Sequence, residues 1–146
     1  MYTVRQLLQV KGNQVWSVSP ETTIFEALQL MAEKNVGAVL VLRNDKVVGI
    51  FSERDYARKV ILKGKSSKTS TVGEVMTREV LYVSPDDTIE DCMALMTAKR
   101  TRHLPVIENG RLGGLISIGD VVKEIISDRE FTIHELERYI TGGYAA

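Results

Sequence analysis

Residues 15–56 read VWSVSPETTIFEALQLMAEKNVGAVLVLRNDKVVGIFSERDY, and residues 80–121 read VLYVSPDDTIEDCMALMTAKRTRHLPVIENGRLGGLISIGDV. The second stretch repeats the first at a constant offset of 65 residues, and fourteen of the 42 aligned positions are identical. Two copies are too few for a solenoid, and such units bury their apolar faces most simply against each other. The duplication therefore predicts two equivalent units packed about a pseudo-two-fold axis.

Each copy carries the same order of local signals. A short extended segment, residues 15–18 or 81–83, ends at Ser-Pro, because proline disfavours helix in the residue before it. Apolar residues then recur at i, i+3, i+4 and i+7, which predicts an amphipathic helix; they are Ile24, Ala27, Leu28 and Met31 in the first copy and Ile89, Cys92, Met93 and Met96 in the second. Apolar strands at 38–42 and 103–107, turns at 44–46 and 108–110, strands at 47–51 and 111–116 and a closing helix complete a β-α-β-β-α unit of the α+β (mixed α/β) class.

The repeat also divides the chain into segments. Residues 1–62 are predicted to form the first repeat with a lead-in helix, residues 63–71 a polar linker, and residues 72–127 the second repeat. The lead-in at residues 4–8 has a counterpart at 72–76. Residues 128–146 are predicted to form a helical tail, in which Ile133, Leu136 and Ile140 could cover a neighbour.

Composition excludes several classes of protein. With 44% hydrophobic residues the chain can build a core, and no apolar run approaches the roughly 18 residues of a membrane span. The N-terminus lacks a signal-peptide pattern, so we expect a soluble, cytoplasmic protein. The single cysteine, Cys92, stands where the first copy has Ala27, which indicates a buried packing residue, and we predict no disulfide and no metal site.

Charge gives no general attraction for polyanions. The formal net charge is zero, so neither nucleic acid nor a membrane surface is an expected partner. Residues 1–73 carry 11 Lys and Arg against 6 Asp and Glu, whereas residues 74–146 carry 8 against 13. Solvated faces are the simpler explanation of this asymmetry, and head-to-tail self-association is the weaker one.

The duplicated Ser-x-x-Asp motif, Ser52 to Asp55 and Ser117 to Asp120, stands where a buried strand gives way to a helix. One interpretation is structural: the motif is a capping box for the helix that follows. The other is functional, because a helix start presents N–H groups to an anion and a carboxylate can accept hydrogen bonds from both hydroxyls of a ribose. The two interpretations are compatible.

Arg102 and His103 precede the buried strand of the second copy, where the first copy has Gly37 and Ala38. A guanidinium and an imidazole beside a carboxylate at a helix start could hold a phosphate, and small residues would let a flat base approach the backbone. Taken singly, a satisfied strand-edge histidine and a surface arginine are the simpler explanations. Combined with the duplicated motif, the pair favours a nucleotide site.

Other motifs carry no chemistry. The glycine-rich stretch 110–114 joins two predicted strands and therefore indicates a hairpin, not a phosphate loop. No nucleophile-elbow or zinc-protease pattern occurs, and His134 has no partner cysteine or histidine nearby. Trp16 is most simply a partly buried anchor. We therefore predict that the protein is not an enzyme.

These residues resemble tandem cystathionine-β-synthase (CBS) domains, the pair called a Bateman module. The resemblance rests on Val-x-x-Leu-Leu, Val-Ser-Pro-x-x-Thr-Ile, the amphipathic helix, the buried strand, and Gly-Ile-Phe-Ser-Glu-Arg-Asp or Gly-Leu-Ile-Ser-Ile-Gly-Asp, and it spans roughly residues 3–127. It implies two related clefts that bind AMP, ADP, ATP, other adenosyl ligands or NAD(H). It also implies a homodimer, and it matches the small members of the family that consist of the pair alone.

Carried over residue by residue, the resemblance implies two sets of ligand contacts. In the second-repeat cleft Asp120 would hold the ribose, and Ser117, Arg102 and His103 would face the phosphate. That set is completed by the following Leu104 and Pro105, by Val36, Gly37 and Ala38 against adenine, and by the closing residues Gly12, Asn13 and Val15. The other cleft would use Asp55, Ser52 and Arg54, with backbone around Thr77, Val80 and Thr101 for the base.

The sequence thus predicts an adenosine-nucleotide sensor that signals in trans to a downstream protein, with the nucleotide as regulatory ligand and no catalytic cofactor. The main alternative is a purely structural dimerisation or docking module with empty pockets. An enzyme and a nucleic-acid binder that uses the basic linker are weaker alternatives.

Overall fold

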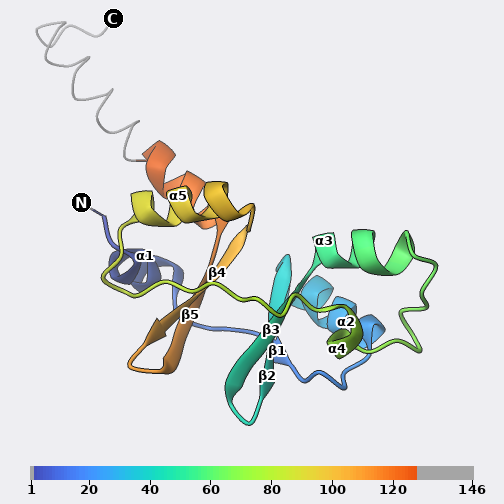
Figure 1. Ribbon diagram of the computed structural model, residues 1–146. Helices are drawn as coiled ribbons and strands as arrows, with labels where there is room; N and C mark the ends of the chain where they lie inside the picture. Colours follow the sequence, from blue (N-terminus) through green and yellow to red (C-terminus); the bar gives the residue numbers. More distant parts are fainter. Residues whose placement is uncertain (1, 128–146) are drawn as a thin grey trace, which may run out of the picture. The chain divides into compact units, whose positions relative to one another are not determined.

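The computed structural model describes residues 2–127. The predicted tail helix with Ile133, Leu136 and Ile140, and also His134, lies outside the described residues. The chain separates into two compact units. Unit 1 takes the residues up to Asn13 together with those from Tyr82 onward, and unit 2 takes Gln14 to Leu81. Each unit contains one copy of the repeat (Figure 1).

Unit 2 is built on a three-stranded sheet with the order β1-β2-β3. β1 (Ser17–Val18) runs parallel to β2 (Ala38–Arg43), and β3 (Lys46–Ser52) pairs antiparallel with β2. Between β1 and β2 the chain forms α2 (Ile24–Lys34). After β3 come α3 (Glu53–Asp55), the π-helical segment η1 (Tyr56–Ile61), and the short helix α4 (Val72–Val75).

Unit 1 repeats this order around the antiparallel hairpin of β4 (His103–Glu108) and β5 (Arg111–Ser117). α1 (Val4–Lys11) and α5 (Ile89–Lys99) precede the hairpin in the chain, and residues 118–127 are helical after it. Val83 forms a single parallel bridge to Val106, where unit 2 has strand β1. The predicted α+β class and the repeated order of elements are confirmed. The first extended segment of each copy is shorter than predicted. Only Ser17 and Val18 pair with the sheet in unit 2, and only Val83 does so in unit 1.

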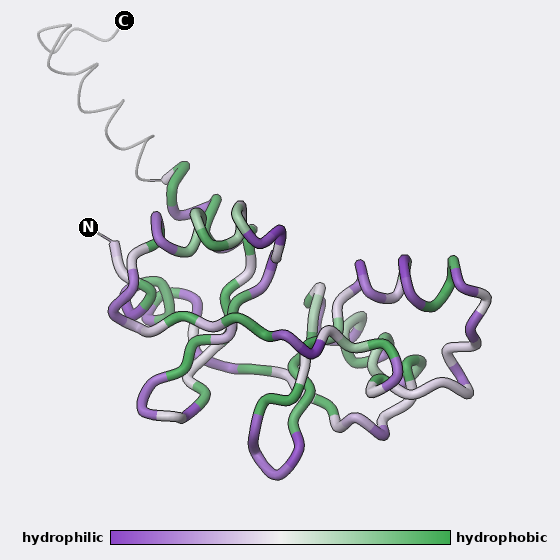
Figure 2. The backbone as a smooth tube through the Cα atoms, in the orientation of Figure 1, coloured by the Kyte–Doolittle hydropathy of each residue, from purple (hydrophilic) through white to green (hydrophobic). Residues whose placement is uncertain are grey.

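Two matching turns close the hairpins. Asn44 and Asp45 have φ of 52° and 64°, and Asn109 and Gly110 have φ of 52° and 75°. Two consecutive residues with positive φ form a type I′ turn, which suits the twist of a hairpin and favours asparagine, aspartate and glycine. Figure 2 shows hydrophilic tips on both hairpins and apolar strands leading to them.

Each unit has its own core. Ile24, Ala27 and Met31 of α2 pack in unit 2 with β2 and β3 residues such as Phe51, and their exposed fractions are at most 3%. In unit 1 Ile89, Cys92 and Met96 of α5 pack in the same way with β4, β5 and α1. Leu28 and Met93, predicted in the same stripes, lie at the edges and are only partly buried. The helical stripes are otherwise confirmed.

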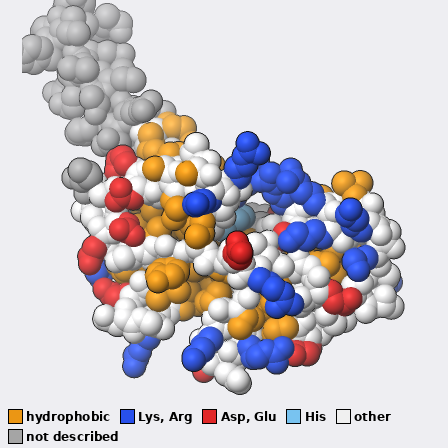
Figure 3. Space-filling model, viewed as in Figure 1, with side chains coloured by type: hydrophobic (Ala, Val, Ile, Leu, Met, Phe, Trp, Pro, Cys, Tyr) orange, Lys and Arg blue, Asp and Glu red, His pale blue; other side chains and the backbone are white. Residues whose placement is uncertain are grey.

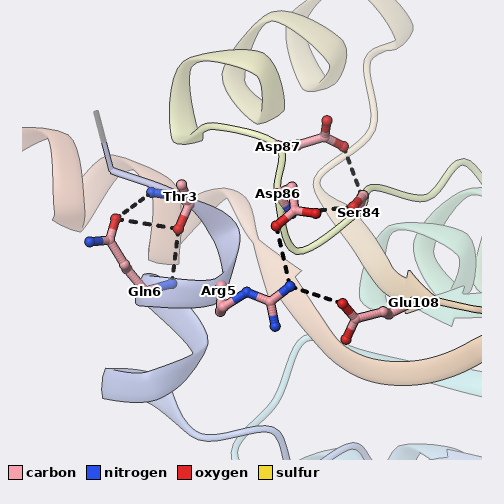
Figure 4. A network of polar contacts seen from close by, with 7 residues as sticks. All are labelled: Thr3, Arg5, Gln6, Ser84, Asp86, Asp87 and Glu108. Atoms are coloured by element: carbon pink, nitrogen blue, oxygen red, sulfur yellow. Dashed lines mark hydrogen bonds and ion pairs between the residues drawn. The ribbon is translucent and has the colours of Figure 1, made fainter.

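The lead-in helices are exchanged between the repeats. α1 precedes the first repeat in the chain but docks on the second: the N–H groups of Val4 and Arg5 donate to the carbonyls of Asp87 and Pro85, both at 2.9 Å. Arg5 also makes exposed ion pairs with Asp86 and Glu108 (Figure 4). A capping box between Thr3 and Gln6, which Figure 4 also shows, starts the helix.

α4 makes the corresponding contact in unit 2, where the N–H groups of Val72 and Gly73 donate to the carbonyls of Thr22 and Pro20, both at 2.8 Å. The two lead-ins are therefore exchanged: α1 precedes the first repeat in the chain but packs on the second, and α4 precedes the second repeat but packs on the first.

The charge asymmetry is visible on the surface in Figure 3, where acidic side chains gather along one edge of unit 1 and basic side chains are spread over unit 2. The linker lysines Lys63, Lys65 and Lys68 are exposed.

Candidate functional site

Both Ser-x-x-Asp motifs form capping boxes. The Ser52 hydroxyl accepts the N–H of Asp55 at 3.2 Å, and Oδ2 of Asp55 accepts the N–H of Ser52 at 3.0 Å. Ser117 and Asp120 make the same two bonds at 3.1 and 2.8 Å. The structural interpretation is therefore confirmed. A functional role remains compatible with it, because a carboxylate has two oxygens and the capping bonds use one of them.

Unit 1 brings four of the predicted site residues to one strand-to-helix junction. His103 lies opposite Ser117 in the register of β4 and β5. The N–H of Ile118 donates to the carbonyl of Arg102 at 2.8 Å, so Arg102 stands beside the start of the helix that carries Asp120. The Arg102 side chain is exposed, and His103 is half-buried. This edge of unit 1 thus combines a carboxylate, a hydroxyl, an imidazole and a guanidinium.

Lys11 is a member of this group that the sequence did not predict. Its Nζ lies 2.5 Å from Oδ2 of Asp120 and donates to the carbonyl of Leu115, also at 2.5 Å. It comes from the last residue of α1, which ends where Gly12 adopts a φ of 95°. Gly12 and Asn13, both predicted to close the site, follow directly. The local sequence gave no signal for this contact, because the partners are 109 residues apart.

The environment of Asp120 keeps it ionised. Burial by itself raises the pKa of this carboxyl. The hydrogen bonds from Lys11 and from the Ser117 backbone, together with the charge of Lys11, outweigh burial, and the net pKa lies below its ordinary value. At neutral pH the junction therefore presents a carboxylate, which accepts hydrogen bonds, rather than a carboxylic acid.

Leu104 and Pro105 have a structural role at this junction. Both are buried, and the Leu104 side chain belongs to the core of unit 1. The carbonyl of Pro105 accepts the N–H of Val83 at 3.0 Å, which ties the incoming segment to β4. Their predicted contact with a ligand stays a prediction.

The equivalent junction of unit 2 is arranged around Asp55, which is 8% exposed. Its Oδ1 accepts the Thr77 hydroxyl at 3.0 Å and lies 3.0 Å from Nζ of Lys59. Ala38 lies opposite Ser52, and the Gly37 carbonyl accepts the N–H of Glu53, as Arg102 does for Ile118. Gly37 and Ala38 are thus the structural counterparts of Arg102 and His103.

Some of the residues predicted to bind the ligand do not lie in the same unit as the carboxylate with which they were grouped. Val15, Val36, Gly37 and Ala38, assigned to the set around Asp120, belong to unit 2. Thr101, assigned to the set around Asp55, belongs to unit 1, where its hydroxyl donates to the carbonyl of His103 at 3.2 Å. Arg54 and Val80 are half-buried in unit 2. The ligand contacts assigned to these residues stay predictions.

Cys92 is inert in this arrangement. It is fully buried on α5, and burial, followed by the charges of Asp87, Asp91 and Glu90, raises its pKa to about 11. The fold therefore favours the neutral thiol. The stability that this preference contributes is complete below the pKa of a thiol in the unfolded chain and is lost as pH rises toward the folded-state value. The predicted packing role is confirmed.

We expect alkylation of Cys92 by iodoacetamide at pH 8 to be about two orders of magnitude slower in the folded protein than in guanidinium, because only the thiolate reacts. Mass spectrometry of samples quenched over time measures both rates. A small free thiol under the same two conditions controls for an effect of guanidinium on the reagent. Equal rates for the folded and unfolded chain would show that Cys92 is accessible and reactive.

The remaining motifs give no further site. Gly110 lies in the turn between β4 and β5, and Gly113 and Gly114 lie within β5, so the predicted hairpin is confirmed. Trp16 packs partly against the core of unit 2, with Nζ of Lys34 4.4 Å from its ring centre. Within residues 2–127, no cluster of three or more His, Cys, Asp or Glu could hold a metal ion. None of the helices in that part combines the length and the apolar character needed to cross a membrane.

Known proteins match this chain along most of its length. The family model for the CBS domain matches twice, at residues 9–62 and 72–127. The mitochondrial CBS domain-containing protein CBSX3 of Arabidopsis thaliana is 38% identical over 138 residues, which cover 91% of this chain and 66% of the plant protein. This chain thus spans just under two thirds of the length of that relative.

Solved structures give the same result. A putative signal-transduction protein with CBS domains from Burkholderia ambifaria is 50% identical, with a TM-score of 0.83, over 86% of this chain and 95% of the other. The structure of CBSX2 in complex with AMP is 26% identical, with a TM-score of 0.70, over 87% of this chain and 98% of the other. The resemblance stated from the sequence is confirmed by both kinds of match.

Proposed function

Because this chain belongs to the CBS domain family, we propose that it is a regulatory module that binds an adenosine nucleotide and passes the bound state to a partner protein. The observation that carries the proposal is the junction in unit 1, where an ionised carboxylate lies beside Ser117, Arg102 and His103. The AMP complex of CBSX2 supports an adenosyl ligand. AMP is therefore the first ligand to test, before ADP, ATP and NAD(H).

Each group at the junction has a role in this proposal. Asp120 accepts hydrogen bonds from the ribose hydroxyls, and charge-assisted bonds of this kind are about twice as strong as neutral ones. Arg102 and His103 face the phosphate, for which a guanidinium provides a planar set of donors. The Ser117 hydroxyl donates a further hydrogen bond to the phosphate. No group is assigned a bond-making step, so the function is recognition and not catalysis.

The regulatory output requires that the ligand favours one conformation over another. In unit 1, Lys11 can couple ligand binding to a change in conformation, because it links α1 to the carboxylate that the ribose would contact. A ribose that shares Asp120 with Lys11 alters the docking of α1, and the partner senses that change. A sensor of cellular nucleotide needs only micromolar to millimolar affinity, about −8 to −4 kcal/mol, which a few hydrogen bonds and one base supply.

We expect AMP at about 100 times its dissociation constant to stabilise the folded chain by about 2.7 kcal/mol, because a ligand that binds only the native state shifts the folding equilibrium. Thermal unfolding at increasing concentrations of AMP, ATP, NAD and S-adenosylmethionine measures this. Adenine-free ribose 5-phosphate serves as the control and should move the midpoint far less. If no adenosyl compound shifts the midpoint, the proposed function is wrong.

The second candidate function is a dimerisation or docking module that needs no ligand. Val122 and Ile126, four residues apart on the helical segment 118–127, are 38% and 50% exposed and form an apolar strip on one helix face. The strip suits a second copy of the chain or another protein. This function predicts association without nucleotide, and an unchanged unfolding midpoint in the titration above would favour it.

A further inference from the structure

We propose that the two copies of the Ser-x-x-Asp motif have divided their roles, so that Asp120 holds the ribose while Asp55 is a structural carboxylate that binds no ligand. This inference rests on the proposed function and assigns its ribose contact to one repeat. It predicts one such site per chain, although the motif occurs twice. Three comparisons between the repeats support it. They concern the groups that donate to each carboxylate, the other contacts that hold those donors in place, and the residues at the equivalent positions of the two repeats.

The Asp55 carboxylate is already saturated. Its Oδ2 accepts the N–H and the hydroxyl of Ser52 at 3.0 and 3.1 Å. Its Oδ1 accepts the Thr77 hydroxyl and pairs with Lys59, both at 3.0 Å. A carboxylate offers about four lone-pair positions, so the three hydrogen bonds occupy three of them, and the Lys59 ammonium lies against the remaining position on Oδ1. A ribose hydroxyl could bind only by displacing one of these donors.

The donors around Asp55 are themselves fixed by other contacts. The N–H and carbonyl of Thr77 both bond to Ile50 of β3, at 2.9 and 3.0 Å, which closes the end of α4 onto the sheet. Nζ of Lys59 also donates to the carbonyl of Val75 at 3.1 Å. Displacing either donor would therefore loosen the docking of α4 on unit 2. The contacts of Asp55 with Thr77 and Lys59 thus hold η1, α4 and the sheet together, and we call this group of contacts the strut.

The Asp120 carboxylate has an oxygen to spare. Its Oδ2 accepts the N–H of Ser117 and the ammonium of Lys11, while within residues 2–127 its Oδ1 accepts no hydrogen bond. That oxygen also reaches solvent, because no buried side-chain oxygen in the described part of the chain is without a hydrogen-bond partner. The Asp120 side chain is 25% exposed, against 11% for Asp55. An incoming hydroxyl therefore finds an accessible, charged acceptor.

The sequence of the repeats explains the difference. Residue 124, which corresponds to Lys59 at the offset of 65, is a glutamate, so the second repeat lacks the lysine of the strut. The lead-ins align at Val4 and Val72, so the counterpart of Thr77 is Gln9, which has no hydroxyl, and within residues 2–127 no hydroxyl group donates to Oδ1 of Asp120. Lys11 replaces only one of these two donors, and it reaches Asp120 because α1 has eight residues where α4 has four. Both lone-pair positions of Oδ1 on Asp120 are thereby left for a ligand.

The test is isothermal titration of the full chain with AMP and with 2′,3′-dideoxy-AMP, which lacks both ribose hydroxyls. The unmodified chain should bind AMP more tightly by about tenfold or more, with one AMP per chain, because even one hydrogen bond to a charged group is worth this factor. Asp120→Asn should remove most of that preference. Asp55→Asn should keep the preference and lower the unfolding midpoint instead.

Thr77→Val provides a second variant if Asp55→Asn does not fold. It removes one donor of the strut without changing the shape of the side chain, and it should keep the preference for AMP. If Asp55→Asn or Thr77→Val abolishes the preference, or if Asp120→Asn retains it, the division of roles is overturned while the proposed function stands. If the unmodified chain binds no adenosyl ligand, both fall together.

Discussion

Replacing Phe51 with alanine should lower the free energy of unfolding of unit 2 by about 3–5 kcal/mol, the usual cost of removing a buried aromatic side chain. Phe51 lies on β3 opposite Val39, and neither side chain is exposed to solvent. Its ring belongs to a core to which α2, β2, η1 and α4 all contribute. Alanine would leave a cavity that helices docked from several directions cannot all close.

Denaturant unfolding monitored by Trp16 fluorescence measures this loss, because the only tryptophan of the chain packs against the same core. Phe25→Ala is the matched control. Phe25 lies on α2 and is 37% exposed, with Lys68 near its ring, so its removal should cost about 1 kcal/mol or less. Equal losses in the two variants would contradict the packing described for β3.

Much of the fold could be predicted because its signals are local and occur twice. The apolar stripe that begins at Ile24 or Ile89 follows a Ser-Pro and a capping threonine in both copies. The asparagine shared by the two hairpins, Asn44 and Asn109, adopts the positive φ that a type I′ turn requires. Because both copies carry each signal, an ambiguous prediction of a helix or turn in one copy can be checked against the other.

The π-helical segment η1 could not be predicted. Residues 56–61 carry no local signal for it, and the second copy continues as an ordinary helix at 118–127. The exchange of the lead-in helices was also missed. The sequence shows that residues 4–8 and 72–76 are alike, but which repeat each helix covers depends on tertiary contacts, such as the burial of Val4 and Leu7 in the core of unit 1.

The candidate site was predicted in its motif but not in its partners. Ser117, Asp120, Arg102 and His103 meet at one junction because strand pairing and the helix start place them there, and both features follow from local sequence. Lys11 reaches Asp120 through a long side chain from a helix that is 109 residues away in the chain. That contact depends on how α1 docks, so it becomes visible only in three dimensions, whereas Lys59 lies only four residues after Asp55.

Gly49→Ala should destabilise unit 2 by about 1–3 kcal/mol, the usual cost of overpacking a core. A Cβ at Gly49 would lie 2.6 Å from Sδ of Met76 and 3.0 Å from the carbonyl oxygen of Thr77. That carbonyl is held by the N–H of Ile50, so it cannot withdraw without breaking the bridge that docks α4. At positions where alanine fits, Gly→Ala stabilises a protein by about 0.4–1 kcal/mol, because it lowers the conformational entropy of the unfolded chain. A net loss of stability at Gly49 would therefore have to come from the clash.

Trp16 fluorescence during denaturant unfolding measures the loss, and faster amide exchange at Ile50 and Thr77 would locate it at the bridge. Gly114→Ala is the matched control in unit 1, because the atoms nearest to its Cβ would be the two methyl carbons of Leu8, at 2.9 and 3.1 Å, and these can rotate away. Gly113→Ala is the second control, since its nearest neighbour is 3.6 Å distant. The loss should therefore be largest for Gly49→Ala, smaller for Gly114→Ala, where a side chain can move, and smallest for Gly113→Ala, where the Cβ meets nothing closer than an ordinary contact. A loss at Gly114 as large as at Gly49 would mean that Leu8 is as firmly fixed as a backbone carbonyl, and that α1 docks on unit 1 more rigidly than its contacts indicate.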